Sequence, residues 1–259
     1  MKLLQVKNLK VEFTTEQGKI LAVDDISFSI EKGQTLAIVG ESGCGKTVTA
    51  LSLLQLISAP GRIRSGQILF QGKDLLSLNA EQQRQVRGKK IAMIFQEPMS
   101  SLNPLLTIGE QVIETLLTHF PTMTRTESRL KTIDLFQQVG IPTPEKRMYD
   151  YPHQLSGGQR QRVMIAIAIS CQPDLLIADE PTTALDVTIQ AQVLNLLKEL
   201  QQKNNMGLIL ITHDLGIVAE SCNDVIVMYA GKITEIGKVD QIFYETRHPY
   251  TKGLLNSIP

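Results

Sequence analysis

The chain has 259 residues, of which 42% are hydrophobic, enough to bury one large α/β domain or a core with a subdomain. Lys plus Arg and Asp plus Glu number 26 each, so the formal net charge is zero. Binding nucleic acid over a broad surface requires a cluster of positive charge, and the balanced composition does not indicate one. We therefore expect no nucleic-acid partner.

Cysteine usage and hydropathy exclude further classes. Cys44, Cys171 and Cys222 have no CxxC spacing, which argues against a disulfide framework or a zinc site and favours a reducing cytoplasm. Charged residues interrupt the N-terminus too early for a signal peptide. No apolar run approaches the roughly 18 residues that span a bilayer. If the protein works at a membrane, other chains must hold it there.

The first elements along the chain are strands. Two loosely alternating segments, Leu3–Phe13 and Ile20–Ile30, flank a short turn and predict an antiparallel pair. Thr35–Val39 is a short, fully apolar strand of the kind that is buried in a parallel sheet. A glycine-rich loop follows, and a helix is predicted over residues 46–57.

Further strands are predicted at Gln67–Phe70 and Ile91–Phe95. Between them, Asn79 with Gln82 three residues later resembles a capping box that opens a short helix. Residues 96–171 then change to proline-marked loops and helical patterns, which predicts an inserted helical subdomain.

Apolar strands resume after this helical region. Three short runs are separated by helical patterns such as Ile189–Leu200, and strands that alternate with helices imply a mostly parallel sheet. The runs are Leu175–Ala178, Leu208–Ile211 and Val225–Met228.

The segment from Gly40 to Thr47 matches the pattern G-x-x-x-x-G-K-[ST]. Its glycines let backbone N–H groups point inward at an anion, and the following helix adds its positive dipole end. Lys46 would neutralise the β- and γ-phosphates of a nucleotide, and the Thr47 hydroxyl would bind Mg²⁺. The alternative is a chance glycine-rich turn, but the loop lies between a predicted strand and helix. The candidate contacts are Gly40, Ser42, Gly43, Cys44, Gly45, Lys46 and Thr47.

Two carboxylates end the apolar strand at 175–178. Because buried charges are costly unless paired or metal-bound, Asp179 is a candidate Mg²⁺ ligand, directly or through water. Glu180 beside it is placed to polarise an attacking water. Taken alone, the pair is equally compatible with a strand followed by an acidic turn.

A Ser-Gly-Gly turn, Leu155–Gln159, opens a predicted helix and creates a second helix N-terminus able to bind an anion. This string resembles the signature of ABC ATPases. In that family two subunits dimerise head to tail, and each signature covers the γ-phosphate held by the partner's phosphate loop. The resemblance therefore implies that Ser156, Gly157, Gly158 and Gln159 bind nucleotide across a dimer.

The resemblance extends to four further positions. Gln96 resembles the Q-loop glutamine that contacts Mg²⁺ or the water, and Asp186 resembles the D-loop aspartate that faces the partner subunit. His213 resembles the switch histidine on the γ-phosphate, although a lone His after a strand is more often incidental. Phe13 is the candidate that stacks on adenine, although a strand Phe is most often a core residue.

The family implies an α/β fold: a P-loop NTPase core with a mostly parallel sheet over residues 1–95 and 172–259. An N-terminal antiparallel β-subdomain belongs to this core, and residues 96–171 form the helical subdomain. ATP and Mg²⁺ are the implied cofactors. The implied catalytic residues are Glu180, His213, Gln96 and Lys46, and the implied metal ligands are Thr47, Gln96 and Asp179.

Within this family, Gln96–Pro104 and His248–Thr251 resemble ATPase subunits of oligopeptide, dipeptide and nickel importers. The implied partners are a second ATPase, identical or related, two integral membrane permease subunits and, indirectly, a substrate-binding protein. The implied location is the cytoplasmic face of the inner membrane. The cysteines lack the clustering of an iron–sulfur tail, so no such cluster is expected.

Other readings stay open. The cargo is a peptide or, alternatively, a nickel or other metal chelate. A soluble ABC ATPase without a permease is less favoured, because the chain has one cassette and no long heptad run. A P-loop kinase or GTPase would have no use for Ser156–Gln159.

Cys44 stands where Ser is common in the phosphate loop. A thiol at a helix N-terminus can have a lowered pKa, so we consider a reactive thiol that ATP would protect from alkylation. The alternative is a small residue that fits the loop.

Overall fold

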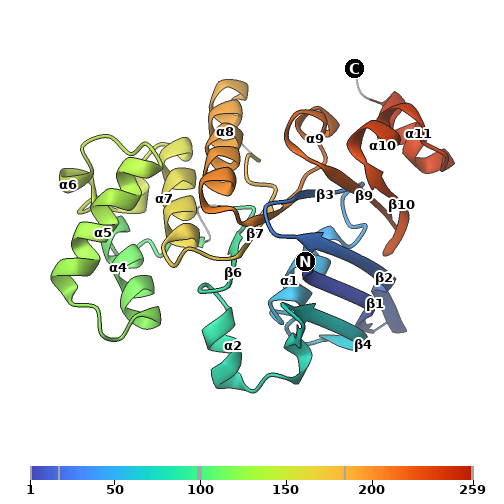
Figure 1. The fold of residues 1–259 in the computed structure, drawn as a ribbon, viewed down its shortest axis with the longest axis horizontal. Helices are drawn as coiled ribbons and strands as arrows, with labels where there is room; N and C mark the ends of the chain where they lie inside the picture. Colours follow the sequence, from blue (N-terminus) through green and yellow to red (C-terminus); the bar gives the residue numbers. More distant parts are fainter. Residues whose placement is uncertain (1, 17, 98–100, 184, 258–259) are drawn as a thin grey trace. The chain divides into compact units, whose positions relative to one another are not determined.

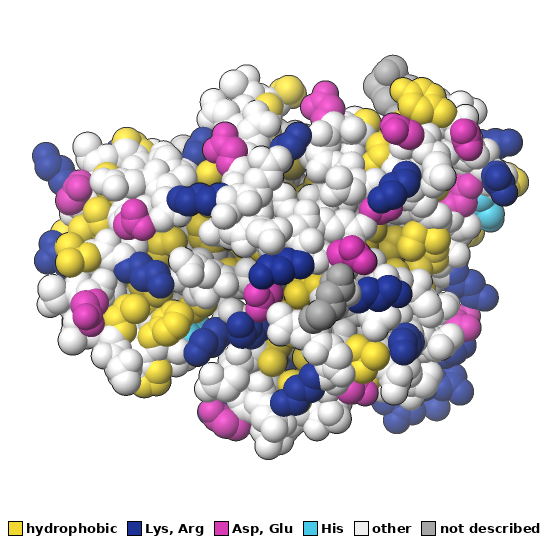
Figure 2. Space-filling model, in the orientation of Figure 1, with side chains coloured by type: hydrophobic (Ala, Val, Ile, Leu, Met, Phe, Trp, Pro, Cys, Tyr) yellow, Lys and Arg dark blue, Asp and Glu magenta, His cyan; other side chains and the backbone are white. Residues whose placement is uncertain are grey.

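The structure is a computed structural model, and it describes residues 2–16, 18–97, 101–183 and 185–257. Its contacts divide the chain into two compact units, residues 1–83 with 205–259 and residues 84–204 (Figure 1). Among the described residues, no helix is long and apolar enough to cross a bilayer. Figure 2 shows Lys and Arg side chains as well as Asp and Glu side chains on the drawn face.

The first unit contains an antiparallel sheet in the order β2-β1-β4-β5. The predicted pair of strands is confirmed and continues to the turn, where Thr15 pairs with Gly18. Several register shifts interrupt this pair, which explains its loose alternation in the sequence. The strands are β1 (Lys2–Thr15), β2 (Gly18–Glu31), β4 (Gly61–Phe70) and β5 (Lys73–Asp74).

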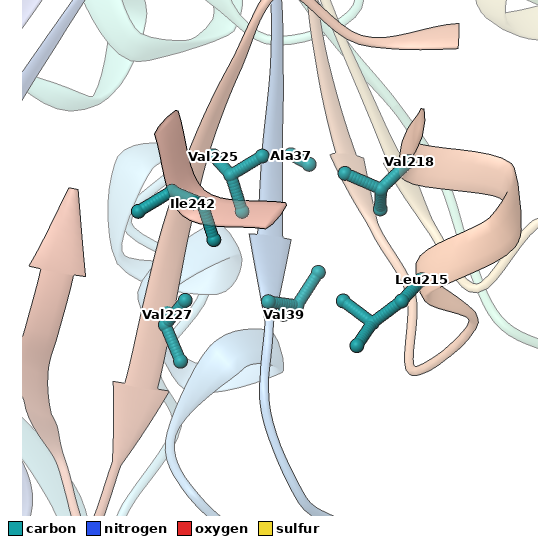
Figure 3. Packing of buried hydrophobic residues seen from close by; sticks show 7 residues of the cluster. All are labelled: Ala37, Val39, Leu215, Val218, Val225, Val227 and Ile242. Atoms are coloured by element: carbon teal, nitrogen blue, oxygen red, sulfur yellow. The ribbon is translucent and has the colours of Figure 1, made fainter. Parts of the chain in front are cut away.

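The same unit holds a second set of strands around β3 (Thr35–Val39), whose five residues are all buried. Strand β3 pairs in parallel with β8 (Gly207–Ile211) and β9 (Asp224–Tyr229), and β9 pairs antiparallel with β10 (Lys232–Lys238). Buried side chains from β3, β9 and two helices form one core cluster (Figure 3), which consists of Ala37, Val39, Leu215, Val218, Val225, Val227 and Ile242.

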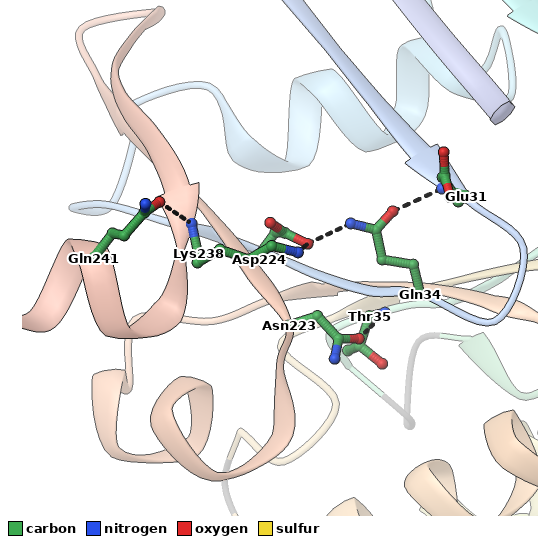
Figure 4. Close-up of polar contacts among 7 residues, drawn as sticks. All are labelled: Glu31, Gln34, Thr35, Asn223, Asp224, Lys238 and Gln241. Carbon is green, nitrogen blue, oxygen red and sulfur yellow. Dashed lines mark hydrogen bonds and ion pairs between the residues drawn. The ribbon is translucent and has the colours of Figure 1, made fainter.

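Polar contacts join the amino ends of β3 and β9 to the carboxyl end of β10 (Figure 4). The Thr35 N–H donates to Asn223 Oδ1 over 2.9 Å, and the Gln34 amide bonds Asp224 Oδ2. Lys238 Nζ lies 3.1 Å from the same carboxylate oxygen. These bonds fix where β3 starts beside β9. They therefore also fix where β3 ends, which is where the glycine-rich loop at Gly40 begins.

Helices of the first unit follow the strands. Helix α1 (Lys46–Leu53) is shorter than the predicted 46–57, because the chain turns at Leu54 and Gln55 has a φ of +51°. The predicted Asn79–Gln82 capping box is present, with bonds of 2.9 and 3.1 Å, and opens α2 (Ala80–Val86), whose last three residues belong to the second unit. The remaining helices are α9 (Leu215–Ser221), α10 (Val239–Tyr244) and α11 (Pro249–Asn256).

The second unit contains two parallel strands, β6 (Ile91–Ile94) and β7 (Leu175–Asp179), whose pairing joins Ile91 to Leu175 and Ile94 to Ala178. Besides a 3-10 helix at Pro152–Gln154, five α-helices lie wholly within this unit among its described residues. They are α4 (Ile108–His119), α5 (Arg125–Gln138), α6 (Pro144–Arg147), α7 (Gly157–Ile169) and α8 (Val187–Asn204).

The predicted fold class is confirmed: parallel strand pairs carry the core, and an antiparallel sheet and helices accompany them. The predicted helical segment 96–171 lies inside the second unit, which also holds β6, β7 and α8. The boundaries at 96 and 171 stay a prediction. Pro98, Met99 and Ser100, which carried part of the importer resemblance, lie outside the described residues, as does Ala184.

Candidate nucleotide site

The phosphate loop connects β3 to α1, and its turns require glycine. Gly40, Gly43 and Gly45 have φ values of +148°, +79° and +106°. A Cβ on Gly40 would lie 2.2 Å from the Met228 carbonyl oxygen, and one on Gly45 would lie 2.4 Å from the Ala22 carbonyl oxygen. Both positions therefore need glycine for their conformation and for the close approach of other backbone.

Lys46 is buried, and its ammonium group lies against its own loop. Its Nζ donates to the carbonyl oxygens of Gly40 and Glu41, over 2.8 and 2.9 Å. Ser42, Gly43 and Thr47 are exposed around it. No side chain caps the start of α1 at Gly45, so the first N–H groups of this helix are placed for an external anion.

Two distant segments hold the backbone of the loop. The Gly231 N–H, from the turn between β9 and β10, donates to the Cys44 carbonyl oxygen over 3.0 Å. The Tyr250 hydroxyl, from α11, accepts the Glu41 N–H over 3.1 Å. Neither contact was predicted from the sequence, since the partners lie far away along the chain.

Cys44 is 6% exposed. Burial raises the pKa of its thiol, and the charge of Lys46 offsets this only in part. The hypothesis of a thiol with a lowered pKa is therefore wrong. The alternative fits better: the sulfur packs inside the loop, where a Cβ added to Gly40 would lie 2.7 Å from it.

His213 and the phosphate loop lie at the same edge of the strands, because β3 and β8 are parallel neighbours and each feature follows its strand. His213 is exposed, just before the Asp214 that caps α9. Phe13 is half-buried and pairs with Gly61 across β4, where a Cβ would lie 2.5 Å from the ring. Phe13 therefore packs within the sheet, as a Phe in a strand most often does. Stacking of Phe13 on adenine stays a prediction.

In the second unit, Gln96 and Glu180 are in direct contact. They follow the parallel strands β6 and β7, and Gln96 Nε2 donates to Glu180 Oε2 over 3.1 Å. The Thr183 hydroxyl donates to the same oxygen over 2.9 Å. Glu180 also has a φ of +44°, a left-handed conformation that is uncommon for a non-glycine residue and is often found at functional sites.

Asp179 is the last residue of β7 and is 2% exposed. A buried carboxylate at the end of a strand is expensive unless a cation or hydrogen-bond donors stabilise it. Metal binding by Asp179 stays a prediction.

The signature turn, Leu155–Gln159, is closed by its own side chains. Ser156 Oγ accepts the Gln159 N–H over 3.3 Å, and Gln159 Oε1 accepts the Ser156 N–H over 3.1 Å. This capping box begins α7, as the predicted turn-to-helix boundary requires. Arg160 Nη1 donates to the Leu155 carbonyl oxygen over 2.6 Å.

The start of α7 packs beside the segment that leads into α8. A Cβ on Gly158 would lie 2.7 Å from Ile189 Cγ2, while one on Gly157 would make an ordinary contact with Leu185. Asp186 Oδ1 accepts the Ile189 N–H over 2.9 Å at the start of α8. Gly158 and Asp186 thus have structural roles here, and their contact with a partner's nucleotide stays a prediction.

The predicted site residues therefore fall into two groups. One group, in the first unit, comprises Phe13, Gly40, Ser42, Gly43, Cys44, Gly45, Lys46, Thr47 and His213; the other, in the second unit, comprises Gln96, Ser156, Gly157, Gly158, Gln159, Asp179, Glu180 and Asp186. The sequence prediction missed Tyr250 and Gly231. Tyr250 lies in the His248–Thr251 segment, which the sequence singled out only through its family resemblance.

Two family models match the chain. Residues 23–183 match the model of the ABC transporter, and residues 234–259 match that of the oligopeptide/dipeptide transporter, C-terminal region. The dipeptide transport ATP-binding protein DppD of Bacillus subtilis is 54% identical over 259 residues, which is 100% of this chain and 77% of that protein. DppD of Escherichia coli is 52% identical over 100% of this chain and 79% of its own length.

Solved structures also place the chain among ABC-type ATP-binding proteins. The dimeric ATP-binding cassette MJ0796, bound to ADP and Pi in a post-hydrolysis state, matches with a TM-score of 0.81 and 26% identity over 91% of this chain and 98% of that chain. The cassette cbiO1 of Clostridium perfringens matches with a TM-score of 0.79 and 27% identity over 95% and 92%.

Fold and site thus define an ATP-binding cassette that hydrolyses ATP. The chain belongs to the ABC transporter family.

Proposed function

We propose that this chain is the ATP-hydrolysing subunit of an importer of dipeptides or oligopeptides. One observation carries the cargo class: relatives that are 52–55% identical over essentially the whole chain are dipeptide or oligopeptide transport ATP-binding proteins. The match of residues 234–259 to the oligopeptide/dipeptide transporter C-terminal region supports the same class.

In this proposal the phosphate loop binds ATP, and Lys46 exchanges its contacts with the Gly40 and Glu41 carbonyl oxygens for the β- and γ-phosphates. Mg²⁺ would be held by the Thr47 hydroxyl and the Asp179 carboxylate, with Gln96 close to the ion or the water. The donor set fits, since Mg²⁺ prefers oxygen ligands and usually combines one or two carboxylates with phosphates. The ion would neutralise charge on the transferred phosphoryl group.

Glu180 is our candidate for the group that orients and polarises the attacking water. Its Oε2 accepts hydrogen bonds from Gln96 and Thr183, which hold the carboxylate in one orientation. A fixed carboxylate can position a water in line with the γ-phosphate, and positioning with charge stabilisation provides most of the catalysis in phosphoryl transfer. His213 would contact the γ-phosphate from the edge of β8.

The signature turn would complete the site of a second subunit. Its own capping box already satisfies part of its helix N-terminus, and the exposed Ser156 is accessible to a partner. The similar cassette MJ0796 is dimeric in its solved structures, which supports pairing of two cassettes. The partner is a second copy or, as we favour, a related ATPase.

We assign residues 96–171 as the helical subdomain that contacts the membrane subunits. Helix α4 and the start of α5 border a groove of about 500 Å³ that is lined by apolar and charged side chains. Its lining residues are Leu106, Glu110, Ile113, Glu114, Leu117, Thr118 and Arg125. Neighbouring Leu105 is 82% exposed. We propose that this groove receives a helix from a permease and so holds the chain on the cytoplasmic face of the inner membrane.

The test is to purify the complete complex with its permeases and binding protein, and to measure its ATPase rate in membranes with and without cargo. We expect a dipeptide or oligopeptide to raise the rate and a nickel chelate to leave it unchanged. Stimulation by the chelate alone would replace the peptide with the metal-chelate alternative. Failure to co-purify with any integral membrane protein would favour a soluble ABC ATPase.

A further inference from the structure

The His248–Thr251 segment contains a contact with the phosphate loop that the proposed function does not use. Tyr250, on α11, lies 209 residues from Glu41 along the chain. Its hydroxyl oxygen accepts the Glu41 N–H over 3.1 Å. Both residues belong to the first unit, so the contact lies within one compact body.

The contact acts on a peptide group that Lys46 also holds. The Glu41 N–H and the Gly40 carbonyl belong to one planar peptide unit, so turning one end turns the other. Tyr250 holds the N–H end, and Lys46 Nζ holds the carbonyl end over 2.8 Å. Without these bonds, Gly40 would leave the following peptide comparatively free to rotate, because it has no side chain.

The Tyr250 ring is itself firmly placed. It packs against the core cluster that contains Val39, the residue before the loop, and its ring centroid lies 4.5 Å from that of Tyr229. His248 Nδ1 accepts the Tyr250 N–H over 3.2 Å and caps α11. The core cluster, Tyr229 of β9 and the His248 cap of α11 together fix the position of the Tyr250 hydroxyl beside the phosphate loop.

Glu235 anchors the start of this segment on β10. Its carboxylate accepts hydrogen bonds from the Thr246 hydroxyl over 2.6 Å and from the Arg247 N–H over 2.7 Å. Partial burial acts to raise the pKa of Glu235, but the hydroxyls of Thr246 and Thr251 and the N–H groups of Arg247 and His248 outweigh it and lower the pKa to about 2. Glu235 therefore holds residues 246 and 247, which lead into α11, against β10.

We propose that Tyr250 is a positioning residue for ATP binding. Through its hydrogen bond with the Glu41 N–H it fixes the Gly40–Glu41 peptide, and with it the Gly40 carbonyl oxygen that Lys46 binds before nucleotide arrives. This rests on the proposed role of the phosphate loop. The C-terminal segment is in this way part of the nucleotide site, although it does not touch the phosphates. Loss of the hydroxyl gives a less ordered loop, which must be ordered when nucleotide binds.

The test is the affinity of the purified full chain for a non-hydrolysable ATP analogue, measured by calorimetry. Tyr250→Phe keeps the ring and removes the acceptor, so we expect the dissociation constant to rise about three- to tenfold, the range that one hydrogen bond provides. The melting temperature and the turnover at saturating ATP are expected to stay close to wild type. Tyr244→Phe, on the 86% exposed Tyr244 of α10, is the matched control and is expected to change none of these.

A double-mutant cycle with Glu41→Pro isolates the contact, because proline has no N–H. If the account holds, Tyr250→Phe adds no further loss of affinity in the Glu41→Pro background. Should Glu41→Pro fail to fold, the comparison of Tyr250→Phe with Tyr244→Phe decides alone. Wild-type affinity in Tyr250→Phe, or equal losses in both Tyr variants, overturns the proposal.

Lys46→Ala separates this proposal from the one it rests on. A large loss of affinity in Lys46→Ala with none in Tyr250→Phe rejects only the role of Tyr250. Unchanged affinity in Lys46→Ala rejects the phosphate loop as the nucleotide site, and both proposals with it.

Discussion

The phosphate loop and the signature turn both lead into the first turn of a helix, but they are held in opposite ways. The phosphate loop depends on distant parts of the chain: the turn at Gly231, the hydroxyl of Tyr250 and the close approach of Ala22. The signature turn is closed locally by Ser156 and Gln159, three residues apart.

This difference corresponds to the two proposed tasks. A loop that must surround phosphates keeps its N–H groups directed inward, so its outer side has to be fixed from elsewhere. A turn that meets a nucleotide held by another subunit needs a rigid, exposed end, and a capping box provides it within one short segment. Changes to the first region should alter nucleotide affinity, and changes to the second should alter turnover.

The largest effect is expected for Glu180→Gln, which separates binding from turnover. The amide keeps the shape but loses the charge that polarises water, so turnover should fall at least about a thousandfold, while ATP affinity should stay within about threefold. The ATPase rate and calorimetry on the same preparation measure the two quantities. Glu199→Gln, on an exposed residue of α8, is the control. Hydrolysis within several-fold of wild type would reject Glu180 as the catalytic base.

A smaller effect is expected for Gly158→Ala, which disturbs the signature turn alone. The new Cβ would lie 2.7 Å from Ile189 Cγ2, so the start of α7 has to shift. We expect turnover to fall roughly tenfold while the isolated chain binds ATP with unchanged affinity. Ile189→Ala removes the clashing methyl group and should restore most of the rate. If the double variant is no faster than Gly158→Ala, the packing explanation is wrong.

The smallest effect is expected for Glu235→Gln, on the anchor of the C-terminal segment. The folded pKa of Glu235, about 2, lies below its ordinary value of 4.5, so its stabilisation is fully present above pH 4.5 and is lost as the pH falls towards 2. After allowance for solvent screening, we expect the variant to be less stable by about 1–2 kcal/mol at pH 7.

Urea unfolding at pH 7, 4 and 3 measures this difference. The gap between wild type and Glu235→Gln should shrink as the pH falls. Glu245→Gln, on an exposed residue of the same segment, should show no gap at any pH. A gap that stays constant from pH 7 to pH 3 would show that the Glu235 charge is not the cause.

Local features were predictable from the sequence, and tertiary ones were not. The Asn79–Gln82 box follows from a three-residue spacing, the helix predicted after the Ser-Gly-Gly turn begins at the Ser156–Gln159 box, and β3 follows from four consecutive apolar residues after Thr35. Strand β10 and helix α11 were not predicted, because β10 is only partly buried and its alternation is weak.

The same limit applied to the site. Glycine spacing predicted the phosphate loop, the end of an apolar strand singled out Glu180, and the family resemblance singled out Gln96, but the contact between the last two was not predicted. The contact of Tyr250 with Glu41 joins residues at opposite ends of the chain, and no local pattern encodes it. The pKa of Cys44 was predicted in the wrong direction, because the helix N-terminus was visible in the sequence and the burial of the thiol was not.

The central claim is that one chain holds the phosphate loop of a site and another chain supplies its signature. Mixing two inactive variants, under conditions in which the wild-type chain alone forms an active homodimer, tests it most directly: Lys46→Ala lacks the phosphate contact, and Ser156→Arg blocks the exposed signature. A dimer of one chain of each kind contains one intact site, made of the loop of the Ser156→Arg chain and the signature of the Lys46→Ala chain. The ATPase rate of the mixture should therefore reach up to about a quarter of the wild-type rate if the chains pair at random. A mixture no faster than the sum of the two separate variants would contradict the claim.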